Sequence, residues 1–434
     1  MFPTLRQFIT KNNFINLLLA IIPISFIAGN MIININIILL ILSVFLLFGI
    51  NVFNIKYYLL DKLIFLFFLL VLITGALNDV SFFITEAWMP KFYTIMKSFA
   101  FLRFLALYLV IRFLVEKEII NFKLFFISCS FFAIFVALDV CIQLIFGKDI
   151  FGFENVGRHF SGPFGNEHVA GGYLQRFSIF SFFLIPIFFK NKINKTIYFV
   201  LPLLFIIFFI SIVISGNRMP LILFLFSIAL IVLFQKQTRK YLISFFISFT
   251  VLFVLIFNIN SSVRINFHNF YGQLSQISKI IISKDFRTTN APPYFKEFAT
   301  FYDTWLLNKY IGGGIKNFRY YCHHRENIDR KSKFVCNMHP HNYYLEILTE
   351  TGLVGFLLLT IIFMQTLYLS FIRKYFIDSP LKDNHIITPF LFLFIAEIFP
   401  LKSTGSFFTT GNSTYFFIIF ALVVALSRKK EKFT

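Results

Sequence analysis

The chain is organised around residues 338–355, MHPHNYYLEILTETGLVG. This stretch ends the only long polar segment of a very hydrophobic sequence and leads into an apolar run. Two histidines, His339 and His341, lie at that boundary. They are two residues apart, so they point the same way in an extended segment, and Pro340 disfavours a helical conformation for His339. A neutral imidazole accepts a proton near pH 7, so this pair is expected to include a reactive group, with a purely structural role for the histidines as the alternative.

Composition and the lengths of the apolar runs predict an all-α polytopic membrane protein. Of 434 residues, 58% are hydrophobic and only 14% are charged, whereas soluble domains carry about a quarter charged residues. A helix needs roughly 17–25 apolar residues to cross a bilayer. Runs of this kind predict about 12 transmembrane helices, at 14–30, 31–51, 61–77, 94–114, 124–147, 172–189, 197–215, 219–235, 241–259, 352–372, 386–402 and 413–427.

The basic residues of the short loops predict the orientation in the membrane, because they collect on the cytoplasmic side. With the N-terminus inside, the inner loops hold most of them, including Lys56, Lys62, Arg112, Lys117, Lys236, Arg373 and Arg428. The outer loops hold only Lys91, Lys148, Arg158, Arg218 and Lys402. Both termini are therefore expected in the cytoplasm, with the polar loop 260–342 outside, between helices of 1–259 and of 343–434. The positions of the basic residues in short loops account for the net charge of +20. We therefore expect no nucleic-acid partner.

Two outer arginines stand out because the charge rule does not explain them. Arg218 lies in the tight turn SGNRMP, 215–220, and Arg158 lies in loop 157–168, which is rich in turn formers. Anchoring in lipid headgroups is the alternative for each. Charges inside the apolar runs are costly in a membrane, so we expect them to pair, to face the bundle interior or to lie near a helix end. These are Lys97, Arg103, Asp139, Arg176 and Glu397.

Segment 260–342 is predicted to carry short helices and to be too small for an independent domain. Leu274, Ile277 and Ile281 recur at helical spacing, which indicates an amphipathic helix on the membrane or on the bundle. A second helix over 298–306 is expected to stop before the glycine run 312–314. These glycines form either a flexible turn or a place where backbone amides approach an anion.

Cys322 and Cys336 bracket a basic part of this segment. Outside the membrane a disulfide between them is the first expectation, and it would tie loop 323–335 back to the histidine stretch. A metal site made of cysteine and histidine is the alternative. The spacing matches no zinc signature, so we expect no metal.

Several motifs resemble the bacterial O-antigen ligase and O-antigen polymerase superfamily. His341-Asn342, nine residues, and then Gly352-Leu353-Val354-Gly355 fit its H-N-x9-G-x-x-G signature, at the end of the one large outer loop. The turn SGNR at 215–218, FGNE at 164–167 and IGGG at 311–314 are similar to further family segments. The resemblance covers about residues 125–425 and implies a GT-C-like membrane fold.

The resemblance implies a glycosyltransferase of the cell envelope that needs no metal, cofactor or nucleotide sugar. It would move a glycan from an undecaprenyl-diphosphate carrier to a sugar hydroxyl at the periplasmic face of the bacterial inner membrane. His341 would be the catalytic base, supported by His339, Asn342, Gly352, Gly355 and Glu346. Arginines suit the diphosphate, and the candidates are Arg218, Arg158, Arg287 and Arg176.

Four activities remain open at this stage. Ligation of O-antigen to lipid A-core, in lipopolysaccharide biosynthesis, is the first expectation. An O-antigen or exopolysaccharide polymerase and a protein O-oligosaccharyltransferase would use the same chemistry on other acceptors. A transporter or flippase, with Asp139 and Glu397 in an ion pathway, is the reading from a different class.

Overall fold

The computed structural model describes residues 11–83, 92–155, 159–189, 196–235, 242–259, 261–283, 293–325, 336, 341–378, 385–403 and 405–429. These residues are helical throughout except for turns, loops and one isolated bridge between Lys148 and Glu154. Within these ranges the structure has no strand, which confirms the predicted all-α fold.

The apolar runs of the sequence coincide with helices. Their bounds are α1 Lys11–Ala28, α2 Asn30–Phe48, α3 Leu59–Phe83, α4 Tyr93–Glu116, α5 Phe122–Phe146, α6 Ala170–Phe177, α7 Ile179–Phe188, α8 Thr196–Ile214, α9 Arg218–Phe234, α11 Leu242–Ile259, α15 Tyr343–Leu367, α16 Ile387–Glu397 and α17 Thr410–Arg428. Seven helical stretches in the described ranges are long and apolar enough to cross a membrane, and four shorter apolar helices accompany them. The protein is therefore a polytopic membrane protein.

Three of the expected spans differ from the observed helices. The sixth is divided between α6 and α7 at Ser178. The tenth begins at Tyr343, well before the expected residue 352, and continues beyond Leu367 as a π-helical segment, Tyr368–Asp378. The eleventh ends early, at Glu397. The residues after Glu397 therefore form a loop, which brings them next to the start of α15.

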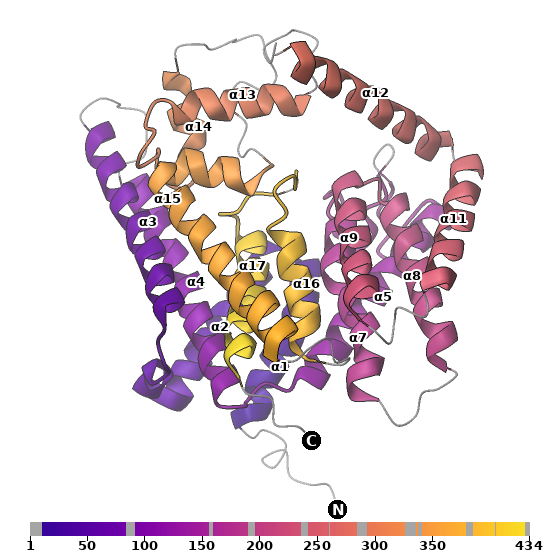
Figure 1. The fold of residues 1–434 in the computed structure, drawn as a ribbon, viewed down its shortest axis with the longest axis horizontal. Helices are drawn as coiled ribbons and strands as arrows, with labels where there is room; N and C mark the ends of the chain where they lie inside the picture. The colour runs from indigo at the N-terminus through magenta and orange to yellow at the C-terminus, as the bar shows by residue number, and fades with distance from the viewer. Residues whose placement is uncertain are drawn as a thin grey trace, which may run out of the picture.

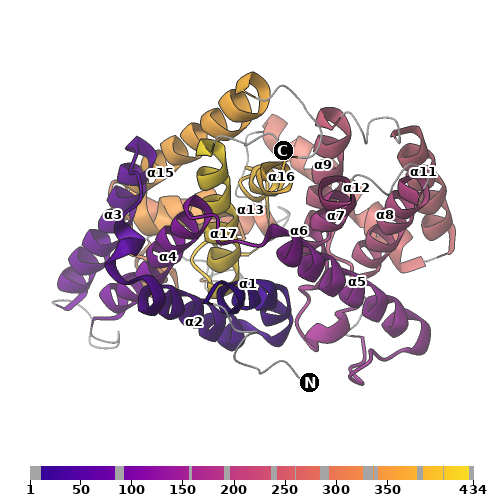
Figure 2. The ribbon, with the colours of Figure 1, turned by 90° about the horizontal axis from the view of Figure 1, so that it is seen from below.

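Helix α17 is the centre of the bundle. Every residue from 413 to 426 is buried, and the helix packs against α4, α16 and α2. In the end-on view of Figure 2, α17 lies among α4, α15 and α16, whereas α5, α7, α8 and α9 form the other half of the molecule. Phenylalanines fill the contacts: Phe417 stacks on Phe104, with ring centroids 5.7 Å apart. The core is thus built largely from aromatic side chains.

The segment between α11 and α15, which is expected outside the membrane and is therefore named the outer segment, crosses one end of this bundle. It contains α12, Ser261–Ser283, and α13, Pro293–Trp305, followed by the short α14, Phe318–Tyr321. The two helices expected from the sequence are thus confirmed. Figure 1 shows α13 at the upper end, above α15 and α17, and α12 at the same end above α8 and α9, reaching α11. Helix α13 packs on the first part of α15, so it covers the region around His341.

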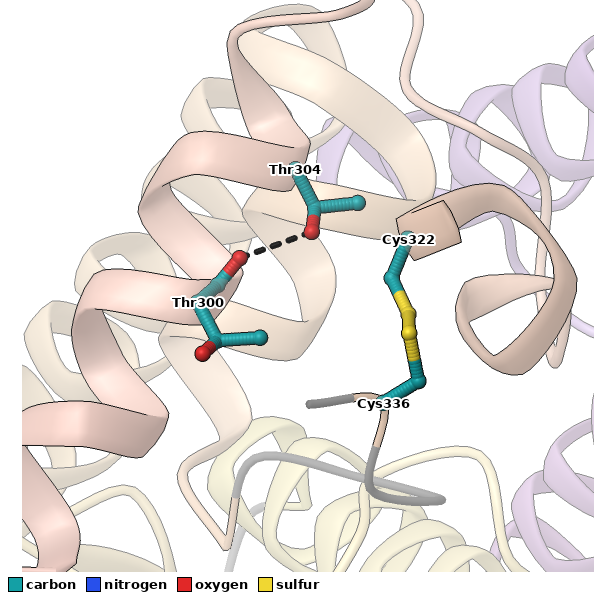
Figure 3. Close-up of a disulfide and its surroundings, with 4 residues drawn as sticks. All are labelled: Thr300, Thr304, Cys322 and Cys336. Carbon is teal, nitrogen blue, oxygen red and sulfur yellow. Dashed lines mark hydrogen bonds between the residues drawn. A yellow bond between two sulfur atoms is a disulfide. The ribbon is translucent and has the colours of Figure 1, made fainter. Parts of the chain in front are cut away.

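The disulfide lies in this outer segment. Cys322 and Cys336 are joined, with their Cα atoms 6.0 Å apart, and Figure 3 shows the bond beside Thr300 and Thr304 of α13. Cys322 is buried with Phe301 and Phe318, whose rings stack at 3.7 Å between centroids. One ring nitrogen of His323 lies within 4.8 Å of both sulfurs, but cysteines bonded to each other are not thiolate ligands.

The opposite end of the bundle holds a buried charge cluster. Asp61 of α3 pairs with Arg112 of α4 and with Arg428 of α17, the latter at 2.7 Å, and accepts a hydrogen bond from Tyr108. Arg112 and Arg428 were expected in loops. Instead Arg112 is only 3% exposed. We infer that this cluster holds the ends of three helices together.

Candidate functional site

Asn342 begins α15 and also fixes a loop beside it. Its Oδ1 accepts hydrogen bonds from the amides of Tyr344 and Leu345, at 3.0 and 3.1 Å. This is the N-cap arrangement that asparagine favours. Its Nδ2 donates to the carbonyl oxygens of Pro400, at 2.9 Å, and of Lys402, at 3.2 Å. The side chain of Asn342 therefore holds the loop after α16 next to the start of α15. His341 directly precedes Asn342 in the chain, so it lies close to this loop.

His341 has an unusual backbone conformation. Its φ is +50°, in the left-handed region that non-glycine residues rarely adopt. Such a conformation costs of the order of 1 kcal/mol or more and persists only when neighbouring structure imposes it. The Asn342 cap follows directly, and α15 then fixes the direction of the chain. The backbone of His341 is consequently held in a defined place at the end of the bundle.

The first glycine of the H-N-x9-G-x-x-G signature, Gly352, allows a close contact between α15 and the outer segment, whereas a Cβ on the second, Gly355, would meet Thr351 of the same helix. Gly352 is non-helical inside α15, with φ +67°, and a Cβ there would overlap the carbonyl of Tyr310. From the other side, a Cβ on Gly312 would lie 2.5 Å from the amide nitrogen of Gly352. The amide of Gly313 donates to the carbonyl of Thr349 at 3.0 Å. The two glycine motifs therefore fit against each other, which separate motif matches could not reveal.

Two glutamates of α15 hold neighbouring segments. Glu346 accepts hydrogen bonds from the hydroxyl of Ser406 and the amide of Phe407. Glu350 accepts from the amide of Lys316 at 2.9 Å, and the Lys316 Nζ reaches Ser406 Oγ at 3.0 Å. Glu346, expected to support His341, thus contacts the loop between α16 and α17. Through these hydrogen bonds, Glu346 holds the loop between α16 and α17 against α15 beside the site.

The turn with Arg218 packs against the loop before α6. Asn217 donates from Nδ2 to the carbonyl of His168 at 3.2 Å, and His159 Nδ1 lies 3.2 Å from the carbonyl oxygen of Ser215. A Cβ on Gly171 would lie 2.6 Å from Ser215 Oγ, so glycine permits this approach. The SGNR and FGNE motifs are therefore neighbours. Arg218, half-buried, is the first residue of α9.

A cavity of about 680 Å³ lies where these parts meet, a size typical of ligand pockets. His341 and Arg176, both expected at the site, line it, as do Asn217 and Pro220 on either side of Arg218. Three expected residues, Arg158, Arg287 and His339, lie outside the described residues. Several other lining residues were not expected at the site from the sequence, among them Gln175, Glu297, Lys402 and Asn412.

A buried charge cluster forms one wall of the cavity. Arg176 Nη2 lies 2.9 Å from Glu397 Oε1, and Lys402 Nζ pairs with the same oxygen. Tyr343 donates its hydroxyl to that oxygen as well, at 2.6 Å, and receives a hydrogen bond from Lys402 at 2.9 Å. The expectation that Arg176 and Glu397 would pair or face the interior is thus met. Lys402, expected in an outer loop, is only 3% exposed.

Burial changes the proton affinity of two groups at this site. It lowers the pKa of His341 below its ordinary value, so the neutral imidazole is favoured. Burial also lowers the pKa of Lys402 to about 8, although the charge of Glu397 acts in the opposite direction. At pH 7 the wall therefore carries a protonated lysine beside an imidazole that can accept a proton.

Fold and site together define a polytopic membrane protein with a cavity at the end of the helix bundle that α12 and α13 cross. The family can be stated more closely. Residues 203–360 match the family model of O-antigen ligase, a range that includes the SGNR turn, the glycine run and the H-N-x9-G-x-x-G signature. The match confirms the resemblance to the O-antigen ligase superfamily and indicates a bacterial, multi-pass, glycosyltransferase-like enzyme. No curated protein matches the chain.

Proposed function

We propose that this protein transfers a glycan from undecaprenyl diphosphate to a sugar hydroxyl, most directly O-antigen to lipid A-core, at the periplasmic face. The observation that carries the proposal is the cavity in which His341 and the cations Arg176 and Lys402 meet. A neutral histidine provides a proton acceptor. Cations provide charge stabilisation for a diphosphate leaving group.

The reaction is a displacement at the anomeric carbon. The acceptor hydroxyl oxygen forms the new bond to that carbon while its proton passes to His341. The bond from the carbon to the phosphate oxygen breaks, and its electron pair leaves with undecaprenyl diphosphate. Arg218, beside the cavity, and Arg176 stabilise the charge that develops on the leaving group. Arg158 and Arg287 remain candidates for the same task.

The positions of two acids make a transporter a weaker proposal. A transporter needs ionisable groups near the middle of the membrane. Asp139 accepts a hydrogen bond from the amide of Ile150, at 2.8 Å, in the loop after α5. Glu397 ends α16 and pairs at the cavity wall. Asp139 thus accepts a hydrogen bond, and Glu397 forms an ion pair, near the cavity end of its helix. These positions favour a transferase over a transporter.

A complementation assay in cells that lack their own enzyme tests the proposal. His341→Ala should abolish the surface glycan and Arg218→Ala should reduce it severely, with membrane insertion verified by immunoblot. His339→Ala should be milder, because the motif spacing selects His341. An inserted His341→Ala protein that leaves the surface glycan intact would rule the proposal out.

The acceptor is tested separately. Purified protein is supplied with a lipid-linked glycan and, in parallel, lipid A-core, a second lipid-linked glycan or a pilin-type protein. We expect glycosylated lipid A-core. A product made only from the second lipid-linked glycan would instead identify a polymerase, and glycosylated protein would identify an O-oligosaccharyltransferase.

A further inference from the structure

We propose that Lys402, Arg176 and Gln175 form an oxyanion subsite in the cavity wall that binds a phosphate group of the donor, with Glu397 holding its two cations in place. Lys402 and Gln175 are binding residues that the sequence motifs do not contain. The inference deepens the proposed function and rests on it, because it names the part of the substrate that this wall receives.

The arrangement of charges is the first argument. Arg176 and Lys402 both line the cavity, whereas the carboxylate that they share, Glu397, is 1% exposed and lies outside the lining. Two cations share one anion, so this wall keeps a net positive charge that faces the cavity. An unbalanced buried charge is costly. A ligand oxyanion at the wall would supply the missing negative charge.

An unsatisfied donor is the second argument. Gln175 lines the same cavity and is only 2% exposed, and its Nε2 has no hydrogen-bond partner among the described residues. Buried amides are nearly always hydrogen-bonded in native proteins, so an exception calls for an explanation. Gln175 precedes Arg176 in α6. An amide donor beside two cations fits the several oxygens of a phosphate group.

The rest of the lining suits the remainder of a glycosyl diphosphate. Two carboxylates, Glu167 and Glu297, also line the cavity, but they come from the loop before α6 and from α13. Asn412 lies next to Arg176, its Oδ1 2.7 Å from Arg176 Nη2. Carboxylates accept hydrogen bonds from sugar hydroxyls. Cations on one wall and acceptors on other elements therefore match a ligand with phosphate at one end and sugar at the other.

Binding of undecaprenyl diphosphate to the purified full chain in detergent tests the subsite without turnover. Lys402→Met keeps the length of the side chain but removes its charge, while Arg176 continues to pair with Glu397. We expect it to raise the Kd about tenfold, the loss of one hydrogen bond to a charged group. Lys402→Arg should restore most of the affinity. Lys148→Met, at an exposed pair with Glu154, is the control and should leave the Kd unchanged.

Gln175→Met is the second variant. It removes a side-chain amide whose nitrogen has no hydrogen-bond partner among the described residues. We expect a several-fold rise in Kd with unchanged thermal stability. Wild-type affinity in both Gln175→Met and Lys402→Met would overturn the subsite. If phosphatidylglycerol competed as well as undecaprenyl diphosphate, the wall would bind a lipid headgroup, and the assignment to the donor would be wrong.

The binding assay separates this inference from the proposed function. A protein that binds undecaprenyl diphosphate through Lys402 but transfers no glycan would contradict the transferase proposal and leave the subsite standing. If the Lys402→Met and Gln175→Met proteins both bind undecaprenyl diphosphate and transfer glycan like the wild type, the subsite alone is contradicted.

Discussion

At the scale of single residues, two neighbours in the sequence have different roles at the cavity. His341 faces it from a left-handed backbone position, and Asn342 holds both the start of α15 and the loop with Lys402. The sequence motif identified His341, because the spacing to the glycines is local. It could not identify Lys402 or Gln175, because their surroundings depend on contacts between segments far apart in the chain.

The pH dependence of transfer follows from the two shifted groups. His341 must be neutral to accept a proton, and its lowered pKa keeps it neutral to pH values below its ordinary 6.5. Lys402 must be charged to bind phosphate, and it loses its proton as the pH rises through about 8. We expect a bell-shaped profile of kcat/KM with an acid limb below pH 6.5 and an alkaline limb near pH 8. The initial rate measured from pH 5 to 10 checks this.

Lys402→Arg provides the control for the alkaline limb. Arginine stays charged throughout this range, so the limb should move upward or disappear while the acid limb stays in place. An unchanged alkaline limb in Lys402→Arg would assign it to another group.

At the scale of elements, the site depends on how α15 meets the outer segment. The expected start at residue 352 was wrong because Glu346, Glu350 and neighbouring threonines look like exposed loop residues. In the structure they are buried, since the loop after α16 and the glycine run bring hydrogen-bonding partners to them. Hydropathy alone cannot predict that a polar residue is buried when its hydrogen-bonding partners come from distant segments of the chain.

Gly352→Ala tests the contact between α15 and the outer segment. An added Cβ would meet the Tyr310 carbonyl at a φ of +67°, so we expect a loss of at least about 2 kcal/mol in stability and little transfer activity. Thermal unfolding in detergent measures the stability. Gly272→Ala, where nothing lies within 4 Å of the new Cβ, should not destabilise the protein. Equal melting temperatures for the two variants would contradict the contact.

The disulfide is expected to stabilise the outer segment that covers the cavity. Cys322 and Cys336 are separated by 14 residues, and closing a loop of that length contributes about 3 kcal/mol in the chain-entropy model. Cys322→Ser and Cys336→Ser should each lower the melting temperature in detergent, as should a reductant on the wild type. Reductant should lower it no further in either variant. Wild-type melting temperatures in both variants would show that the bond is dispensable.

At the scale of the whole molecule, the fold was largely predictable because apolar runs of membrane length have few alternatives to helices. How the helices meet was not predictable. The cluster of Asp61, Arg112 and Arg428 joins α3, α4 and α17 at the end opposite the outer segment. The charge rule predicts that both arginines lie on the same side of the membrane, but it carries no information on which side chains pair.

Asp61→Asn tests whether this cluster holds the bundle together. It leaves Arg112 buried without its anion, a change that costs about 3–5 kcal/mol. We expect a large fall in the melting temperature in detergent, with acceptor preference unchanged in the folded fraction. Glu154→Gln removes the exposed pair with Lys148 and should change the melting temperature little. Similar small effects of both substitutions would contradict a structural role for Asp61.

The central claim, that His341 carries out glycan transfer in this cavity, is tested most directly by reconstitution. Purified protein in liposomes is given an undecaprenyl-diphosphate-linked glycan and lipid A-core, and the initial rate of glycan transfer is measured. We predict transfer by the wild type and a loss of about 10²–10⁴-fold in His341→Ala, the usual contribution of a general base, with donor binding retained. Transfer by inserted His341→Ala at the wild-type rate would contradict the account.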